Sequence, residues 1–278
     1  MLQVFRPPSD AAHWIDAAVV IRLGAGVCES RFPALPHAML TMRVAHAPGR
    51  SVAGGVPCGP VDFHTLSTEP AVHRHAGDIS ALGLLVRPAA AACLLGHAGA
   101  AVANQVLAWN VVAGCHEAAR LEDEVQAACS DIERLRLLLA SLRRVMGAVS
   151  RGRDAAYALL CDAVGRHGAQ AGEALGLGRR QLERRCQAVL GVAPKQFQRV
   201  LRFHHALSLG VTAGAARMAE TALEAGFYDQ SHLARDARQL AGAPMGALLS
   251  AARPDSAWWP LATRRSLAGA RGLHSTAS

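Results

Sequence analysis

The spacing of hydrophobic residues changes along this chain. Near the N-terminus, four short apolar runs are separated by turns rich in proline and glycine, a pattern that predicts β-strands at 17–23, 38–45, 61–67 and 79–86. From residue 88 onward the apolar positions follow a helical period, which predicts a short helix at 88–95 and one or two helices within 121–149. We therefore expect an α+β N-terminal domain, β-rich or barrel-like with trailing helices.

Two later stretches, about fifty residues apart, share the pattern of a helix-turn-helix. Gly176 and Gly226 each end a helix, because glycine adopts the left-handed conformation at little cost. A capping position follows each turn, at Gly178 and Asp229. An apolar stripe at i, i+4, i+7 and i+8 then marks the inner face of each second helix. The stripes are Leu182, Cys186, Val189 and Leu190, and Leu233, Ala237, Leu240 and Ala241.

The residues between these units form one long helical pattern, from 194 to about 209. At about 1.5 Å per residue it spans roughly 24 Å. Successive major-groove entries on one face of DNA lie roughly 34 Å apart. The sequence thus predicts an all-α C-terminal domain with two helix-turn-helix units joined by a long helix, both able to contact one face of DNA.

The region from about 151 to 250 resembles the DNA-binding domain of the AraC/XylS family of bacterial transcription regulators. The matching residues are Leu182 to Arg185, Gly191, Pro194, Phe197, Arg202, Ala206, Leu207, 226 to 233 and Arg235. There are departures: Cys186 and Ala237 stand where the family usually has a core Phe, and Ala193 and Ala243 where a Ser usually caps the next helix.

The resemblance implies a transcription regulator whose N-terminal domain senses a small-molecule effector, dimerises, or both. The segments 32–36, 87–91 and 94–96 are similar to one branch of the family. A second apolar stripe, at Leu135, Leu138, Leu139, Leu142 and Val145, has two interpretations: it packs on the first domain, or it forms an antiparallel homodimer seam. The implied partners are double-stranded DNA, an effector, RNA polymerase and a second copy of the chain.

The outer faces of the two recognition helices supply the candidate DNA contacts. Arginine can bridge guanine O6 and N7, glutamine can read adenine, and glutamate can accept from cytosine N4. The predicted base-reading residues are Arg180, Glu183, Arg184, Gln230, Ser231 and Arg235. Phosphate contacts, which fix register without reading sequence, are predicted for Arg179, Lys195, Arg199, Arg202 and His232.

The net charge of +8 is unevenly distributed. Residues 1–150 hold 12 basic and 12 acidic side chains, whereas residues 151–278 hold 17 and 9. An excess confined to one part of the chain is typical of a protein that binds a polyanion. Only one basic residue, Lys195, is a lysine. The arginine preference suits bidentate DNA contacts, but GC-rich codon usage would explain it as well.

Other chemistry is weakly indicated. His73 and His75, with Cys58, Cys115 and His116, offer metal-binding side chains, but no third ligand stands out by spacing, and the histidine pair is expected in a loop or surface strand. We therefore expect no metal, no cofactor and no catalytic residue. Three alternatives stay open: an N-terminal small-molecule-modifying enzyme, a redox sensor using one cysteine, and a sequence-blind DNA-packaging module.

The expected organisation is a sensor or dimerisation domain at 1–145, a DNA-binding domain at 151–252 and a disordered basic tail at 253–278. The first 25 residues lack the unbroken apolar core of a signal peptide, and no stretch is long and apolar enough to span a bilayer. The expected location is the cytoplasm, without membrane attachment.

Overall fold

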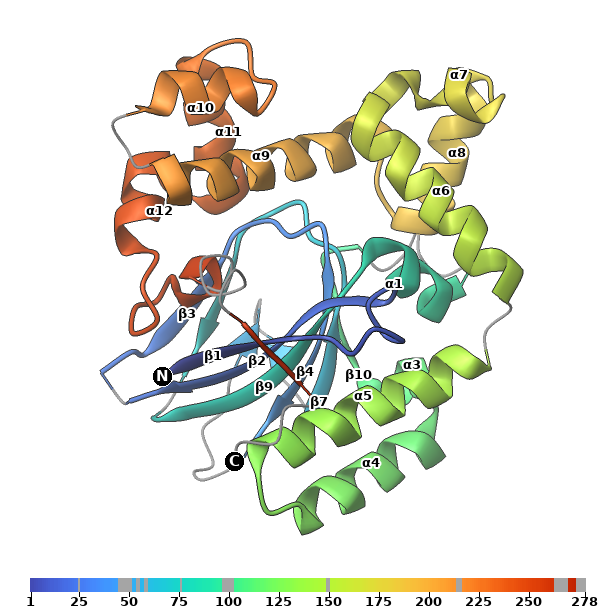
Figure 1. Cartoon of the computed structure of the whole chain (residues 1–278), viewed down its shortest axis with the longest axis vertical. Coiled ribbons are helices and arrows are strands. Elements are labelled where there is room, and N and C mark those ends of the chain that lie inside the picture. Colours follow the sequence, from blue (N-terminus) through green and yellow to red (C-terminus); the bar gives the residue numbers. More distant parts are fainter. Residues whose placement is uncertain are drawn as a thin grey trace.

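The computed structural model has a β-rich N-terminal part and a helical C-terminal part (Figure 1). It describes residues 1–24, 26–44, 52–53, 56–57, 60–75, 77–96, 103–148, 151–213, 217–262 and 270–273. The strands are β1 (Leu2–Arg6), β2 (Ile15–Leu23), β3 (Glu29–Phe32), β4 (Ala38–Arg43), β5 (Val52–Ala53), β6 (Val56–Pro57), β7 (Val61–His64), β8 (Ala71–Arg74), β9 (Ile79–Val86), β10 (Val106–Ala108) and β11 (Arg271–Gly272).

The strands form two sheets that face each other. The larger has the order β10-β7-β4-β9-β2-β1-β11 and the smaller β3-β8-β5-β6. At the centre of the larger sheet, β9 pairs antiparallel with β2 and β4, with Leu84 opposite both Ala18 and Leu40. Side chains alternate between the faces of a strand, so one face of this sheet meets helices while the other faces the smaller sheet. All four predicted strands are confirmed, as β2, β4, β7 and β9.

Helices make up most of the chain after β9. They are α1 (Pro88–Leu95), α3 (Trp109–Ala113), α4 (Cys115–Ala127), α5 (Asp131–Gly147), α6 (Arg151–His167), the short 3-10 helix η2 (Gly168–Gln170), α7 (Ala171–Leu175), α8 (Arg179–Leu190), α9 (Pro194–Ala213), α10 (Met218–Glu224), α11 (Gln230–Ala241) and α12 (Met245–Ala251). Within the described part of the chain, no helix combines the length and hydrophobicity needed to cross a membrane.

Helix α5 packs on the larger sheet through the leucine stripe noted in the sequence. Leu135, Leu138, Leu139 and Leu142 are buried in the same core cluster as Leu40 and Leu84. Of the two interpretations of this stripe, packing on the first domain is therefore the one observed. The stripe is covered in the monomer and does not offer a dimer seam.

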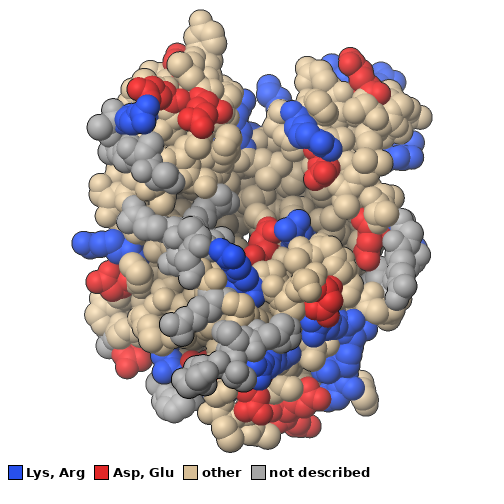
Figure 2. All heavy atoms as spheres, in the orientation of Figure 1, with Lys and Arg blue, Asp and Glu red and all other residues tan. Residues whose placement is uncertain are grey.

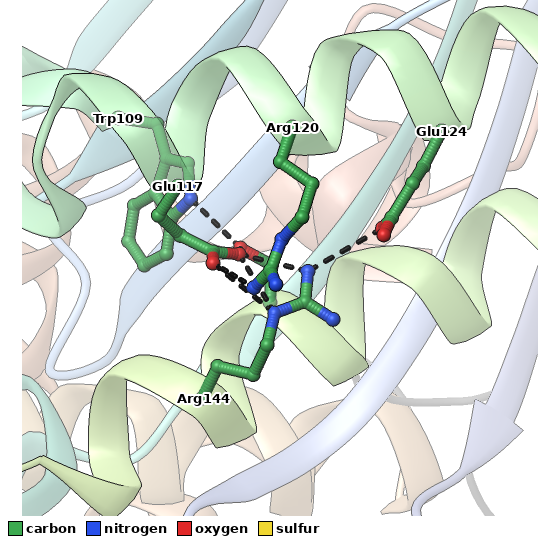
Figure 3. Close-up of polar contacts among 6 residues, drawn as sticks. Trp109, Glu117, Arg120, Glu124 and Arg144 are labelled. Atoms are coloured by element: carbon green, nitrogen blue, oxygen red, sulfur yellow. Dashed lines mark hydrogen bonds and ion pairs between the residues drawn. The ribbon is translucent and has the colours of Figure 1, made fainter.

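A polar network joins α4 to α5 (Figure 3). Glu117 on α4 accepts hydrogen bonds from Ser141 Oγ at 2.6 Å and from Arg144 Nη2 at 2.8 Å, and it also pairs with Arg120. Trp109 donates its indole N–H to the same Ser141 hydroxyl at 3.0 Å. Because Trp109 and Ser141 are fully buried, these bonds satisfy polar groups that water cannot reach.

The chain after α12 returns to the N-terminal part, so the prediction of a disordered tail does not hold for its described residues. Trp259, Leu261 and Leu273 are buried, and β11 pairs parallel with β1. Apolar burial of this kind offsets the conformational entropy lost when a segment becomes ordered. The two tryptophans at 258 and 259 were the sequence signal that this segment could be buried. Two arginines within the expected basic tail, Arg264 and Arg265, lie outside the described residues.

We expect Glu117→Ala to destabilise the protein by about 1–3 kcal/mol, because it leaves the Ser141 and Arg144 side chains without their acceptor. Burial alone would raise the pKa of Glu117, but hydrogen bonds from Arg144 and Ser141 outweigh it and lower that pKa. The stabilisation is then present above the unfolded-state pKa and lost as pH falls through the lower folded-state value. Denaturant unfolding at neutral and acidic pH measures both effects.

The matched control is Glu122→Ala, an exposed glutamate on the same helix. Its unfolding midpoint should stay close to that of the unmodified protein. Equal losses for the two variants would contradict a specific role for the Glu117 network.

Candidate nucleic-acid interface

The two predicted turns have the same backbone geometry. Gly176 and Gly226 adopt left-handed conformations, with φ of 63° and 80°. In the first unit, Leu177 N donates to Gly172 O at 2.8 Å. In the second, the equivalent bond runs from Phe227 N to the carbonyl of Ala222, also at 2.8 Å. Both are the six-to-one bonds of a Schellman helix end, so the chain closes two helices in the same way.

Close packing of the turn against the end of the preceding helix explains the small residue before each turn. A Cβ added at Gly172 would lie 2.5 Å from the carbonyl oxygen of Leu177, closer than real contacts allow. The equivalent Ala222 is fully buried. Large side chains at either position would force the turn and the following helix apart.

Each recognition helix begins at the predicted cap. Asp229 accepts a hydrogen bond from His232 N at 2.6 Å at the start of α11. Gly178 precedes α8, and its own N–H donates to Gln181 Oε1 at 3.1 Å. Cys186 and Ala237, the small residues on the inner faces, are both fully buried. These two side chains lie in the cores of the first and second units, respectively.

All six predicted base-reading side chains are exposed on the structure. They are Arg180, Glu183 and Arg184 on α8, and Gln230, Ser231 and Arg235 on α11. Arg184 and Arg235 occupy equivalent positions, two residues after the buried Leu182 and Leu233. In the protein alone, Glu183 Oε1 lies 3.2 Å from Arg179 Nε, an exposed ion pair of little stabilising value.

Helix α9 separates the two units. Its 20 residues extend beyond the predicted end at 209 and give a length of about 30 Å. Figure 1 shows α9 running between the unit containing α8 and the unit containing α11. In Figure 2, basic side chains lie on both walls of the notch between the two upper lobes.

The domain that contains these two units can now be assigned from comparison with known proteins. Residues 172–251, from within α7 to the end of α12, match the family described as a helix-turn-helix domain. These residues form an AraC-type helix-turn-helix domain. Domains of this type bind DNA and regulate transcription. No curated protein matches the chain.

Solved structures of ToxT from Vibrio cholerae are similar to this chain at 12% identity. One has a TM-score of 0.49 and covers 84% of this chain and 97% of its own. A structure of wild-type ToxT with an unsaturated fatty acid bound has a TM-score of 0.48 and covers 89% and 94%. A third, of ToxT bound to (E)-4-(8-methylnaphthalen-1-yl)but-3-enoic acid, has a TM-score of 0.49 and covers 90% and 98%. The family assignment rests on the helix-turn-helix match.

The predicted phosphate-contacting residues divide into two groups. Arg179 and Lys195 are exposed. Arg199 and Arg202, in contrast, reach a buried carboxylate on α11: Arg199 Nη2 lies 2.8 Å from Asp236 Oδ1, and Arg202 Nη2 lies 3.8 Å from Asp236 Oδ2. The observed geometry thus gives these two arginines a role in holding α11 against α9, and their phosphate contacts stay predictions.

Aromatic contacts extend this arrangement around the second turn of the AraC-type domain. The Arg202 guanidinium lies 4.5 Å from the centre of the Phe227 ring, and Phe227 meets His232 edge-to-face at 5.2 Å. His232 is half-buried. Its predicted phosphate contact is therefore untested, while its packing on Phe227 is observed.

Asp236 is the residue that the sequence analysis missed. It stands on the inner face of α11, three residues after the buried Leu233, where an acid is unexpected. A charged residue inside an apolar stripe indicates a buried partner, which is a usable sequence signal. Its partners were not predictable by spacing, because Arg199 lies on a different helix.

The N-terminal sheets and Trp259 line a partly open cavity of about 90 Å³. Apolar side chains, among them Val19, Ile21 and Phe32, form most of its wall. Hydrogen-bonding groups gather at one part of the lining. They are Ser30, Thr41, Arg43, His64, His73 and His75.

The expectation that His73 and His75 occupy a loop or surface strand is wrong for His73. That residue is buried on β8, with its ring centre 5.3 Å from that of His64 on β7. Burial lowers the pKa of His64 to about 3 and that of His73 to about 4, with neighbouring positive charges adding to the effect, so both rings are neutral at pH 7. Among the described residues no group of three His, Cys, Asp or Glu could hold a metal ion, and Cys58 lies outside them.

We expect Asp236→Ala to destabilise the AraC-type domain by roughly 1–3 kcal/mol, because Arg199 and Arg202 lose the carboxylate that they share. Denaturant unfolding followed by circular dichroism measures the loss. Asp255→Ala, at a highly exposed aspartate, is the control and should leave the midpoint unchanged. An unchanged midpoint for Asp236→Ala would show that the buried ion pairs do not hold α11 in place.

Proposed function

We propose that this protein is a sequence-specific DNA-binding regulator whose helices α8 and α11 enter successive segments of the major groove. The observation that carries the proposal is the equivalent presentation of two polar helix faces, at the two ends of α9. A helix of about 30 Å comes close to the groove spacing of roughly 34 Å, and a modest bend in the DNA would make up the difference.

In this proposal the exposed outer-face residues read bases. Arg180, Arg184 and Arg235 pair with guanine, Gln230 with adenine and Glu183 with cytosine, after Glu183 leaves its exposed ion pair. Ser231 contributes a further hydrogen bond, and Arg179 and Lys195 contact phosphates. Glu183 on this face favours sequence-selective over sequence-blind binding, because a carboxylate makes no favourable contact with DNA phosphates.

We further propose that the N-terminal cavity binds the effector. An apolar lining with a neutral, hydrogen-bonding histidine cluster suits an apolar molecule that carries one polar head group. Binding, and not turnover, is the proposed role of this site. RNA polymerase and a second copy of the chain stay predictions of the family resemblance.

Selection of the full-length protein against a random duplex library, followed by sequencing, tests the DNA-binding proposal. We expect an enriched motif with two elements about one helical turn apart. Salt-dependent binding without enrichment, with and without candidate effectors, would contradict sequence-specific recognition and favour a sequence-blind packaging module.

Arg184→Ala should weaken binding to the selected site by about 1–3 kcal/mol and relax specificity at one base position, as expected when a bidentate base contact is lost. Arg185→Ala is the matched control, because residue 185 is exposed on the same helix but lies about 100° around its axis. Titrations with the selected duplex and with single-base variants measure both. Equal weakening on selected and random DNA would overturn the base-reading role of Arg184.

Lys195→Ala should weaken selected and random DNA to the same extent, because a phosphate contact carries no sequence information. The slope of log affinity against log salt should fall by about 1. Binding measured over a series of salt concentrations tests this. A loss confined to the selected site would mean that Lys195 reads a base.

A further inference from the structure

The segment that follows α12 connects the second helix-turn-helix unit to the N-terminal cavity. Figure 1 shows it descending from α12 toward β3. The Arg31 N–H on β3 donates to the carbonyl of Ala257 at 2.7 Å, and the Trp259 indole N–H donates to Ser30 Oγ at 2.7 Å. Both bonds end on neighbouring residues of β3, so the segment is fixed to the smaller sheet.

Two nearby residues of this segment belong to different cores. Trp259 is 8% exposed and clusters with Ile21 and Phe32 of the sheets, meeting the Phe32 ring edge-to-face at 5.5 Å. Leu261 is 3% exposed and lies in the core of the second helix-turn-helix unit, which also contains Leu240. Because Trp259 and Leu261 are only two residues apart, a shift of Trp259 would be transmitted along the chain to the packing of the second unit.

Trp259 also stands between two cavities. It lines the cavity of about 90 Å³ inside the sheets and a second one, of about 440 Å³, that reaches His204 and Ser208 on α9. The first is much smaller than a typical ligand pocket of about 300–1,000 Å³. Phe32 and Met39 line both cavities as well, so the two spaces adjoin, and an indole ring that moved aside would open a path between them.

The polar part of the inner cavity reaches Trp259 directly. Ser30 Oγ, which accepts the indole N–H, is also 2.9 Å from His75 Nε2. Ser30 is itself buried. A ligand head group that hydrogen-bonds to Ser30 or His75 would compete with the indole for the same hydroxyl.

The loop after β3 provides a second connection to the helical part. Ala34 N donates to Leu240 O at 2.6 Å, and Ala34 O lies 2.6 Å from His204 Nε2. Ala34 is fully buried in the core of the second unit and is only two residues from Phe32, the ring against Trp259. Movement of the Phe32–Trp259 pair thus reaches the second unit by two routes.

We infer that Trp259 is a displaceable wall of the effector site: an apolar ligand with a hydrogen-bonding head enters the joined cavity by moving the indole, and this loosens the second helix-turn-helix unit from the sheets. The inference rests on the proposed function only in taking this cavity as the effector site. Its test needs no DNA, so a failed DNA selection and a failed test of Trp259 are distinguishable.

The test compares Trp259→Ala with Trp258→Ala in the full-length protein, using 8-anilino-1-naphthalenesulfonate as an apolar probe with an acidic head. Trp258 is a matched control, since it packs against the core of the second unit. We expect Trp259→Ala to bind the probe at least tenfold more tightly than Trp258→Ala does. Adding Ala81→Phe, which fills the inner cavity, should reverse the gain.

Amide hydrogen exchange measures the coupling between the cavity at Trp259 and the second helix-turn-helix unit. The Ala34 amide is bonded to Leu240 O across the contact, so its exchange should accelerate at least tenfold in Trp259→Ala relative to the unmodified protein. Equal probe binding by the two tryptophan variants would overturn the inference that Trp259 closes a ligand site. Tighter probe binding with unchanged Ala34 exchange would overturn the coupling.

Should Trp259→Ala fail to fold, Trp259→Phe replaces it. This variant removes the indole N–H that bonds Ser30 and opens space beside Phe32. Both readouts should then shift in the same direction by at least threefold. No shift in either would overturn the inference.

Discussion

Helix α9 contributes side chains to the cores of both helix-turn-helix units, and their relative position depends on it. Phe197, near its start, lies in the core of the first unit with Leu182 and Cys186. Val200 and Phe203, further along, lie in the core of the second. Because all of these side chains are fully buried, rotating either unit about α9 would expose apolar surface. The spacing of α8 and α11 is thus set by packing within the protein.

The two units repeat a backbone plan but differ in how the recognition helix is held. Arg185 on α8 is exposed, whereas the equivalent residue on α11 is the buried Asp236. Its carboxylate joins α11 to Arg199 on α9, which fixes the second helix more specifically than apolar contact alone. Removing one partner of such a pair leaves an uncompensated charge. The ion pair therefore fixes the position of α11 but makes the domain sensitive to mutation of either partner.

Local patterns predicted the elements that bury long apolar runs, but not those whose stability comes from distant partners. The apolar runs that form β2 and β9 were predicted from the sequence, as were the turns at Gly176 and Gly226. The short strands β3 and β8 were not predicted, because each has only four residues, of which half or more are charged or polar. The burial of Trp259 also depends on Ser30, more than two hundred residues earlier, which no periodicity reveals.

The contact between sheets and helices constrains any effect of a ligand on DNA binding. A ligand shifts an equilibrium only through a difference in its affinity for two states, and the proposed displacement of Trp259 from the cavity wall would supply such a difference. Linkage makes the effect reciprocal: if occupancy of the cavity changes DNA affinity by some factor, DNA changes ligand affinity by the same factor. If the cavity binds an effector as proposed, the segment after α12 would transmit its occupancy, because it joins the core of the second unit to the wall of the cavity.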